Sequence, residues 1–233
     1  MRGTIACYPP VWGGDGAGTG REARQRSLRT VVLTEAITTC LGASALLYGD
    51  RRAVLCDPYY PKHEILSPAE TETALAWHRF GLRCRDLFFE GEDTSWYEIG
   101  DENGAVALYW DGPVRPEPIG GALFARVVRT DDRIAVAVVD LTGSANGSWR
   151  EPTSGGRCRS VQARVLLGCP AEWEAAVTTL GSAGDRFVGA PFTVVEHREG
   201  LAAELEVPLG AGWAVLRMTR RRGPSSTPAP SGG

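Results

Sequence analysis

Four side chains near the start of the chain carry groups that could bind a small polar molecule. A carboxylate accepts hydrogen bonds from ligand hydroxyls, and a tyrosine offers a flat apolar ring with a polar tip. The structural alternative is that Asp50 closes a Gly-Asp turn, that Asp57 initiates a turn before a proline, and that the tyrosines are half core and half surface. The four candidates are Tyr8, Asp50, Asp57 and Tyr59.

Familiar metal, nucleotide and nucleophile motifs are absent from the sequence. The six cysteines form no C-x-x-C pair, and the three histidines are too far apart for a known metal-ligand spacing. The glycine-rich run 13–20 fits neither a phosphate loop nor a dinucleotide fingerprint. No serine stands in a G-x-S-x-G context. We therefore expect no metal site, no cofactor and no serine nucleophile.

The composition is that of a globular protein, because 43% of the 233 residues are hydrophobic and 23% are charged. The net charge of −3 gives no electrostatic reason to expect nucleic acid or an anionic membrane as a partner. No apolar run approaches the roughly 18–20 residues that cross a bilayer. The first ten residues lack the apolar segment of a secretion signal, and the sequence leaves the location open.

Residues 1–92 predict a strand–helix–strand–helix series, which requires a parallel sheet because the helices provide the crossovers. A loop is expected over 57–66. The second helix begins at Ser67-Pro68-Ala69-Glu70, a capping box with proline at the first helical position, and it carries Trp77 and Phe80. The expected elements are a strand at 5–12, a helix at 21–41, a strand at 43–48 and a helix from 67 to 88.

Residues 93–219 predict a second domain, an antiparallel β-sandwich, with the boundary between 91 and 104. Short runs with period-two alternation recur at about ten-residue spacing, with turn residues and no helices between them. The tail 220–233 is basic and then rich in Pro, Ser and Gly, and we expect it to be disordered. The expected strands are 106–110, 123–129, 134–141, 161–167, 175–180, 192–197, 201–207 and 213–219.

An ordered series of motifs resembles the C-terminal portion of glycoside hydrolase family 66, the family of endo-dextranases and cycloisomaltooligosaccharide glucanotransferases. The resemblance covers about residues 5–219. Its parts are Leu46-Leu47-Tyr48-Gly49-Asp50, which is similar to the last barrel strand of the family, then Val54-Leu55-Cys56-Asp57-Pro58-Tyr59-Tyr60-Pro61, Val136-Ala137-Val138-Val139-Asp140-Leu141-Thr142-Gly143 with Trp149-Arg150, and Gly212-Trp213-Ala214-Val215-Leu216.

The resemblance implies the last two βα units of a TIM-type (β/α)₈ barrel, followed by a β-sandwich. Family members cleave or transfer α-1,6-glucan with retention, using an Asp nucleophile and a Glu acid/base, two carboxyls about 5 Å apart. Those residues lie on earlier barrel strands, so the resemblance assigns no catalytic residue to this chain. Ala45 and Leu47 stand where the family has His and Glu, which reduces the polar contacts of that strand.

Three hypotheses follow. The first is a truncated, dextranase-like glycoside hydrolase portion that is inactive alone, whose sugar contacts are the four candidates named above. The second is a module that binds carbohydrate without cleaving it, through exposed Trp96, Trp110 or Trp149. The third is one half of a split enzyme, because the bare edges of two βα units invite an upstream polypeptide that completes the barrel. Relatives are generally exported, yet this chain carries no export signal.

Overall fold

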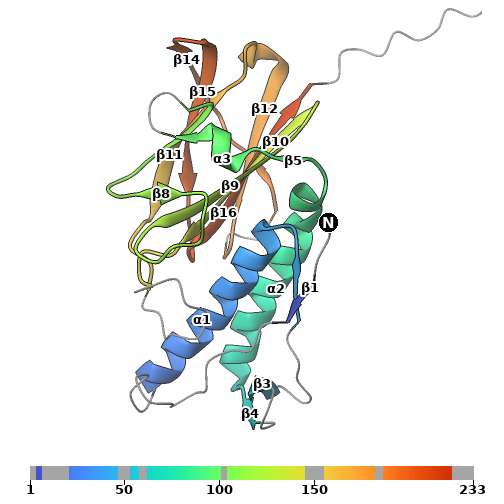
Figure 1. Ribbon diagram of the computed structural model, residues 1–233, viewed down its shortest axis with the longest axis vertical. Coiled ribbons are helices and arrows are strands. Elements are labelled where there is room, and N and C mark those ends of the chain that lie inside the picture. Colours follow the sequence, from blue (N-terminus) through green and yellow to red (C-terminus); the bar gives the residue numbers. More distant parts are fainter. Residues whose placement is uncertain are drawn as a thin grey trace, which may run out of the picture.

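Two mostly antiparallel sheets packed face to face form the upper part of the molecule in Figure 1. The computed structural model describes residues 4–6, 21–46, 53–57, 62–100, 104–144, 155–181 and 186–221. Within these residues, a seven-stranded sheet has the order β13 (Val188–Gly189), β12 (Trp173–Thr179), β16 (Trp213–Arg220), β10 (Arg133–Asp140), β9 (Leu123–Thr130) and β5 (Glu92–Asp93), with β8 (Val114–Arg115) beside β9. A five-stranded sheet has the order β14 (Thr193–His197), β15 (Gly200–Pro208), β11 (Ser160–Leu166), β7 (Val106–Tyr109) and β6 (Ile99–Gly100).

The eight strands predicted between 106 and 219 are all present, each within two residues of its expected limits. The β-sandwich is therefore confirmed. The expectation that no helix lies between these strands was wrong, because the 3₁₀ helix η1 (Pro170–Glu172) lies between β11 and β12, and a second short helix, α3 (Ser95–Glu98), precedes them between β5 and β6. Each is about one turn long, too short to leave a helical period in the sequence. The two-residue strands were missed for the same reason.

Strand β10 is buried on both faces. Its even-numbered residues from Ile134 to Val138 lie in the core between the two sheets. Its odd-numbered residues from Ala135 to Val139 lie in a second core, on the opposite face of the strand. A half-exposed strand would alternate apolar and polar residues, so the continuous apolar run of β10 reflects the extra layer that covers it.

That extra layer consists of α1 (Arg21–Cys40) and α2 (Pro68–Phe89), so the molecule has three layers. Trp77 and Phe80 of α2 both contact Trp213 of β16, with ring centroids 5.9 Å and 4.7 Å apart. Gly81 allows this close approach, because a Cβ there would lie 3.3 Å from the Trp213 ring. The expected core face of the second helix is thus present, and it packs against the sandwich.

The start of α2 is fixed locally by the predicted capping box. The Ser67 hydroxyl accepts a hydrogen bond from the Glu70 backbone N–H at 3.3 Å, and the Glu70 carboxylate accepts one from the Ser67 N–H at 2.7 Å. Pro68 occupies the first turn, where its missing N–H costs nothing. These two hydrogen bonds satisfy donors that a helix start would otherwise leave unpaired.

Before α2, β1 (Thr4–Ala6) and β2 (Ser44–Leu46) pair in parallel, as the strand–helix order requires. The expected loop over 57–66 was wrong in part, because β3 (Ala53–Asp57) and β4 (Lys62–Ile65) form an antiparallel hairpin. A bulge between Leu55 and Asp57 interrupts its register. Such a short pairing depends on two segments meeting in space, which local periodicity does not reveal.

The division into domains 1–92 and 93–219 stays a prediction. The helices share a core with the seven-stranded sheet, and β5 begins at residue 92. Residues 222–233 of the expected tail lie outside the described residues. In the described part of the chain, no helix is long and apolar enough to cross a membrane.

Candidate functional site

The carboxyl ends of β1 and β2 mark the candidate site. Ala6 and Leu46, the last residues of these strands, are register partners, so both strands end at the same edge. In Figure 1 both helices begin toward the lower end, where the β3–β4 hairpin lies, away from the sandwich. In α/β folds, ligands bind at the carboxyl ends of parallel strands. We call the hairpin and the first turns of α1 and α2 the strand-end region.

Of the four sequence candidates, the structure places only Asp57. It is the last residue of β3 and pairs with Lys62 of β4, next to the bulge. Tyr8, Asp50 and Tyr59 lie outside the described residues. Their assignment as sugar contacts stays a prediction.

Arg24 holds the strand-end region together. Its guanidinium donates to both carboxylate oxygens of Glu70, at 2.6 Å and 2.9 Å, and to the backbone oxygen of Ile65 at 2.5 Å. One side chain from the first turn of α1 therefore joins the end of β4 to the start of α2. No local signal in the sequence identifies a partner 46 positions away.

Glu70 is a structural anion and a poor candidate for a general acid. Burial by itself would raise the pKa of Glu70, but hydrogen bonds from Arg24 and Ser67 lower that pKa below its ordinary value. Both carboxylate oxygens are occupied by these donors. A general acid needs a raised pKa and a free oxygen, and Glu70 has neither.

A second carboxyl group has the opposite environment. Glu35 of α1 is only 4% exposed, and one of its oxygens lies 2.5 Å from Nδ1 of His78 in α2. Burial raises the pKa of Glu35, and the hydrogen bond from His78 opposes that rise without cancelling it. A retaining glycosidase needs two facing carboxyls. The described contacts pair Glu35 with a histidine instead, so they do not provide that pair.

The described residues contain no group of His, Cys, Asp and Glu side chains that could hold a metal ion. Two of the tryptophans proposed for carbohydrate binding can be placed. Trp96 in α3 is 60% exposed, beside Tyr97 at 86%. Trp110 is half-buried, and its indole N–H donates to the Pro113 oxygen at 3.2 Å, so the ring is held against the turn that follows it. Trp149 lies outside the described residues.

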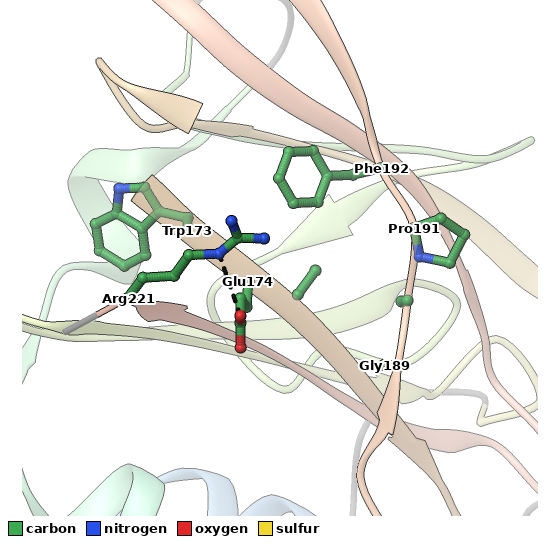
Figure 2. A pocket seen from close by; sticks show the side chains of 8 residues that line it. Trp173, Glu174, Gly189, Pro191, Phe192 and Arg221 are labelled. Atoms are coloured by element: carbon green, nitrogen blue, oxygen red, sulfur yellow. Dashed lines mark ion pairs between the residues drawn. The ribbon is translucent and has the colours of Figure 1, made fainter. Parts of the chain in front are cut away.

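The sandwich carries an open hollow of its own, of about 400 Å³, shown in Figure 2. Trp173, Glu174 and Arg221 lie on one side, and Gly189, Pro191 and Phe192 lie on the other. The Arg221 guanidinium forms an ion pair with Glu174 at 3.1 Å. No residue of this hollow was singled out from the sequence, because β12, the β13–β14 segment and the end of β16 meet only in the fold.

Comparison with family models and with curated proteins finds no match. Among solved structures, the chain is similar to a cycloisomaltooligosaccharide glucanotransferase of a Paenibacillus species in complex with cycloisomaltoheptaose, with 16% identity and a TM-score of 0.67 over 81% of this chain. A family 30 subfamily 8 xylanase of Clostridium acetobutylicum gives a TM-score of only 0.36 at 10% identity, over 94% of this chain and 42% of that one. Only the first likeness bears on the fold. The chain thus shares the fold of part of a glucanotransferase and spans 27% of that enzyme's length.

Proposed function

We propose that this chain forms the closing βα units and the C-terminal β-sandwich of a family 66-like glycoside hydrolase that acts on α-1,6-glucan. The observation that carries the proposal is the order of its parts along the chain: a parallel β1–β2 pair, a helix that follows each of these strands, and a sandwich packed on the helices. The fold similarity to a glucanotransferase supports it.

In this proposal the chain alone has no glycosidase activity. Among the described residues, β1 and β2 pair only with one another, so both outer edges of this small sheet have backbone groups left to be satisfied. Further barrel strands, which carry the catalytic Asp and Glu, complete the sheet from an upstream polypeptide. The contribution of this chain to catalysis is indirect: it forms one wall of the sugar cleft.

Tyr8, Asp50, Asp57 and Tyr59 form the sugar contacts in this proposal. The carboxylates accept hydrogen bonds from glucose hydroxyls, and the tyrosine rings stack on the apolar face of a pyranose. Arg24 positions this wall by holding the end of β4 and the start of α2, close to the hairpin that contains Asp57.

Two measurements test the proposal. The purified chain should release no reducing sugar from dextran, and rapid release would contradict it. Co-expression with a polypeptide that carries the earlier βα units of a family 66 enzyme should give a stable complex that cleaves dextran. In that complex, Asp57→Asn should lower activity, whereas Asp86→Asn on the exposed face of α2 should not. Failure to form any complex would remove the barrel interpretation.

A carbohydrate-binding module without catalytic partners is the second candidate. The exposed rings of Trp96 and Tyr97 favour it, because an exposed aromatic ring offers a flat apolar surface for a sugar ring. Affinity electrophoresis in dextran separates the two candidates. A module should be retarded on its own, and Trp96→Ala should abolish the retardation.

A further inference from the structure

A second hollow lies on the helix side of the seven-stranded sheet, beside the end of α2. It has a volume of about 530 Å³, within the usual size of a small-molecule site. Two of the residues that border it, Leu87 and Phe187, belong to or pack against the core shared with the helices. The hollow in Figure 2 is on the other face of β12, because its Trp173 and Phe192 belong to the core between the sheets. We call the second hollow the helix-side hollow.

Two arginines border the helix-side hollow as diagonal neighbours on one face of the sheet. In the register of β10 and β16, Arg133 lies opposite Thr219 and Arg217 lies opposite Ala135. Side chains of this length reach one another across such a diagonal. The guanidinium group stays charged at every pH at which proteins fold. The fold therefore brings two positive charges to the same hollow.

Neutral groups hold both guanidinium groups in place. Arg133 donates through Nη2 to the Glu90 backbone oxygen at 2.9 Å, and the Arg217 guanidinium lies 4.3 Å from the centre of the Phe187 ring. A carbonyl group or an aromatic ring positions a cation but has no net charge to offset it. Within the described part of the chain, neither arginine forms an ion pair with an acidic side chain.

The two carboxylates that border the hollow have other partners. Glu174 forms an ion pair with Arg221 at 3.1 Å, which offsets its charge. Asp132 is exposed to solvent, and its carboxylate accepts a hydrogen bond from the Thr130 hydroxyl at 2.9 Å. Water and salt screen an exposed charge of this kind. The hollow therefore keeps an excess of positive charge.

The outer nitrogens of Arg217 are the atoms that a ligand can reach. Its Nε is buried, but its two Nη atoms are not among the buried atoms without a partner, and no hydrogen bond to them is found within the described residues. These Nη atoms therefore contact solvent. A carboxylate or phosphate group binds such a guanidinium edge through charge-assisted hydrogen bonds.

We propose that the helix-side hollow binds a small molecule through an oxyanion group, a carboxylate or a phosphate. The oxyanion accepts hydrogen bonds from the Nη atoms of Arg217, and the neighbouring charge of Arg133 adds to the attraction. The rest of the ligand occupies the hollow beside Phe187 and Ala176. The site is separate from the strand-end region, and it depends neither on the proposed barrel nor on the proposed sugar contacts.

Two pairs of variants separate this site from a general effect of charge. Arg217→Gln removes the proposed contact. Arg220→Gln is its matched control, because it removes the same charge from the same strand at an exposed position that pairs with Glu172. Ala176 lies directly opposite Arg217 and borders the hollow, so Ala176→Glu supplies an internal carboxylate for that arginine. Ala176→Gln adds a side chain of the same size without the charge.

Titration calorimetry of the full chain with sodium succinate, sodium phosphate and sodium chloride, at matched ionic strength, gives the readout. We expect succinate, phosphate or both to bind and chloride not to bind, and the two oxyanions distinguish a carboxylate ligand from a phosphate ligand. Arg217→Gln should weaken the Kd by about tenfold or more, and Ala176→Glu should abolish binding. Arg220→Gln and Ala176→Gln should keep the Kd within about threefold of the wild-type value.

The proposal is overturned if neither oxyanion binds more tightly than chloride. Binding that Arg217→Gln leaves unchanged, or that Arg220→Gln weakens equally, would also contradict it. Circular dichroism shows whether each variant is folded. If Arg217→Gln does not fold, the comparison of Ala176→Glu with Ala176→Gln decides, and equal binding by these two variants would refute the site. Because these assays need no dextran, their failure is distinct from failure of the proposed function.

Discussion

The indole of Trp213 in β16 stacks on the indole of Trp77 in α2, with their planes 30° apart. Trp213 is fully buried in the core between its sheet and the two helices. The opposite face of the same sheet packs against the other sheet. This contact joins the helix layer to the sandwich. It explains why the two parts, which the sequence separates into an α/β region and an all-β region, share one core.

Removing either aromatic ring from α2 should therefore destabilise the whole chain. We expect Trp77→Ala or Phe80→Ala to lower the free energy of unfolding by about 3–5 kcal/mol, through lost burial and the cavity left behind. Urea denaturation followed by tryptophan fluorescence and circular dichroism measures this change. Leu82→Ala on the exposed face of the same helix is the control. A loss below about 1 kcal/mol would mean that the helix packs less tightly than this contact indicates.

The Arg24–Glu70 pair predicts a specific acid response. The pKa of Glu70 lies below its ordinary value in the folded chain, so the pair stabilises the fold fully above the ordinary pKa and is lost as pH falls through the lowered one. Glu70→Gln should lower the free energy of unfolding by about 0.5–1 kcal/mol at neutral pH. It should also remove the part of the acid-induced loss of stability that comes from this pair. Thermal unfolding across acidic pH measures it. Glu72→Gln, an exposed neighbour on α2, should retain the wild-type profile.

Glu35 should have the opposite pH dependence. Its pKa is raised in the folded chain by burial, so its contribution to stability is fullest below the ordinary pKa and is lost as pH rises toward the raised value. Glu35→Gln mimics the protonated acid and should be at least as stable as the wild type at neutral pH. The difference between the two should shrink as pH is lowered. Melting curves between about pH 4 and pH 8 test this, and a markedly less stable Gln variant would show that the ionised pair with His78 is favourable.

Asp140 should be essential for the sandwich. It is 1% exposed and accepts hydrogen bonds from the Thr142 hydroxyl at 2.6 Å and from the Thr142 and Cys158 N–H groups at 2.9 Å and 3.0 Å. Asp140→Ala leaves these buried donors unpaired, and we expect it to lower the free energy of unfolding by about 2–4 kcal/mol. Gly156→Ala should also destabilise, because its Cβ would lie 2.0 Å from the Asp140 carboxylate. Chemical denaturation provides both values, with the exposed Asp131→Ala as control.

Local patterns in the sequence were enough to predict the two helices and the eight main strands. The capping box at Ser67 and Glu70 acts within three residues, and the alternation in strands such as β11 repeats every second residue, so each signal is complete within its own segment. The β3–β4 hairpin and the single-turn helices carry no such signal. They form because segments that lie beside them in the fold provide hydrogen-bond partners for their backbone N–H and C=O groups.

The candidate site divides in the same way. The sequence identified Asp57 as a candidate binding residue, and it predicted that a helix follows each of the strands β1 and β2. Only the tertiary structure decided that Arg24 binds Glu70, and that Glu174, Gly189 and Arg221 border one hollow, because these partners are far apart along the chain and meet only when the layers pack. Hydrophobic periodicity specifies which face of an element is buried, but packing decides what that face contacts.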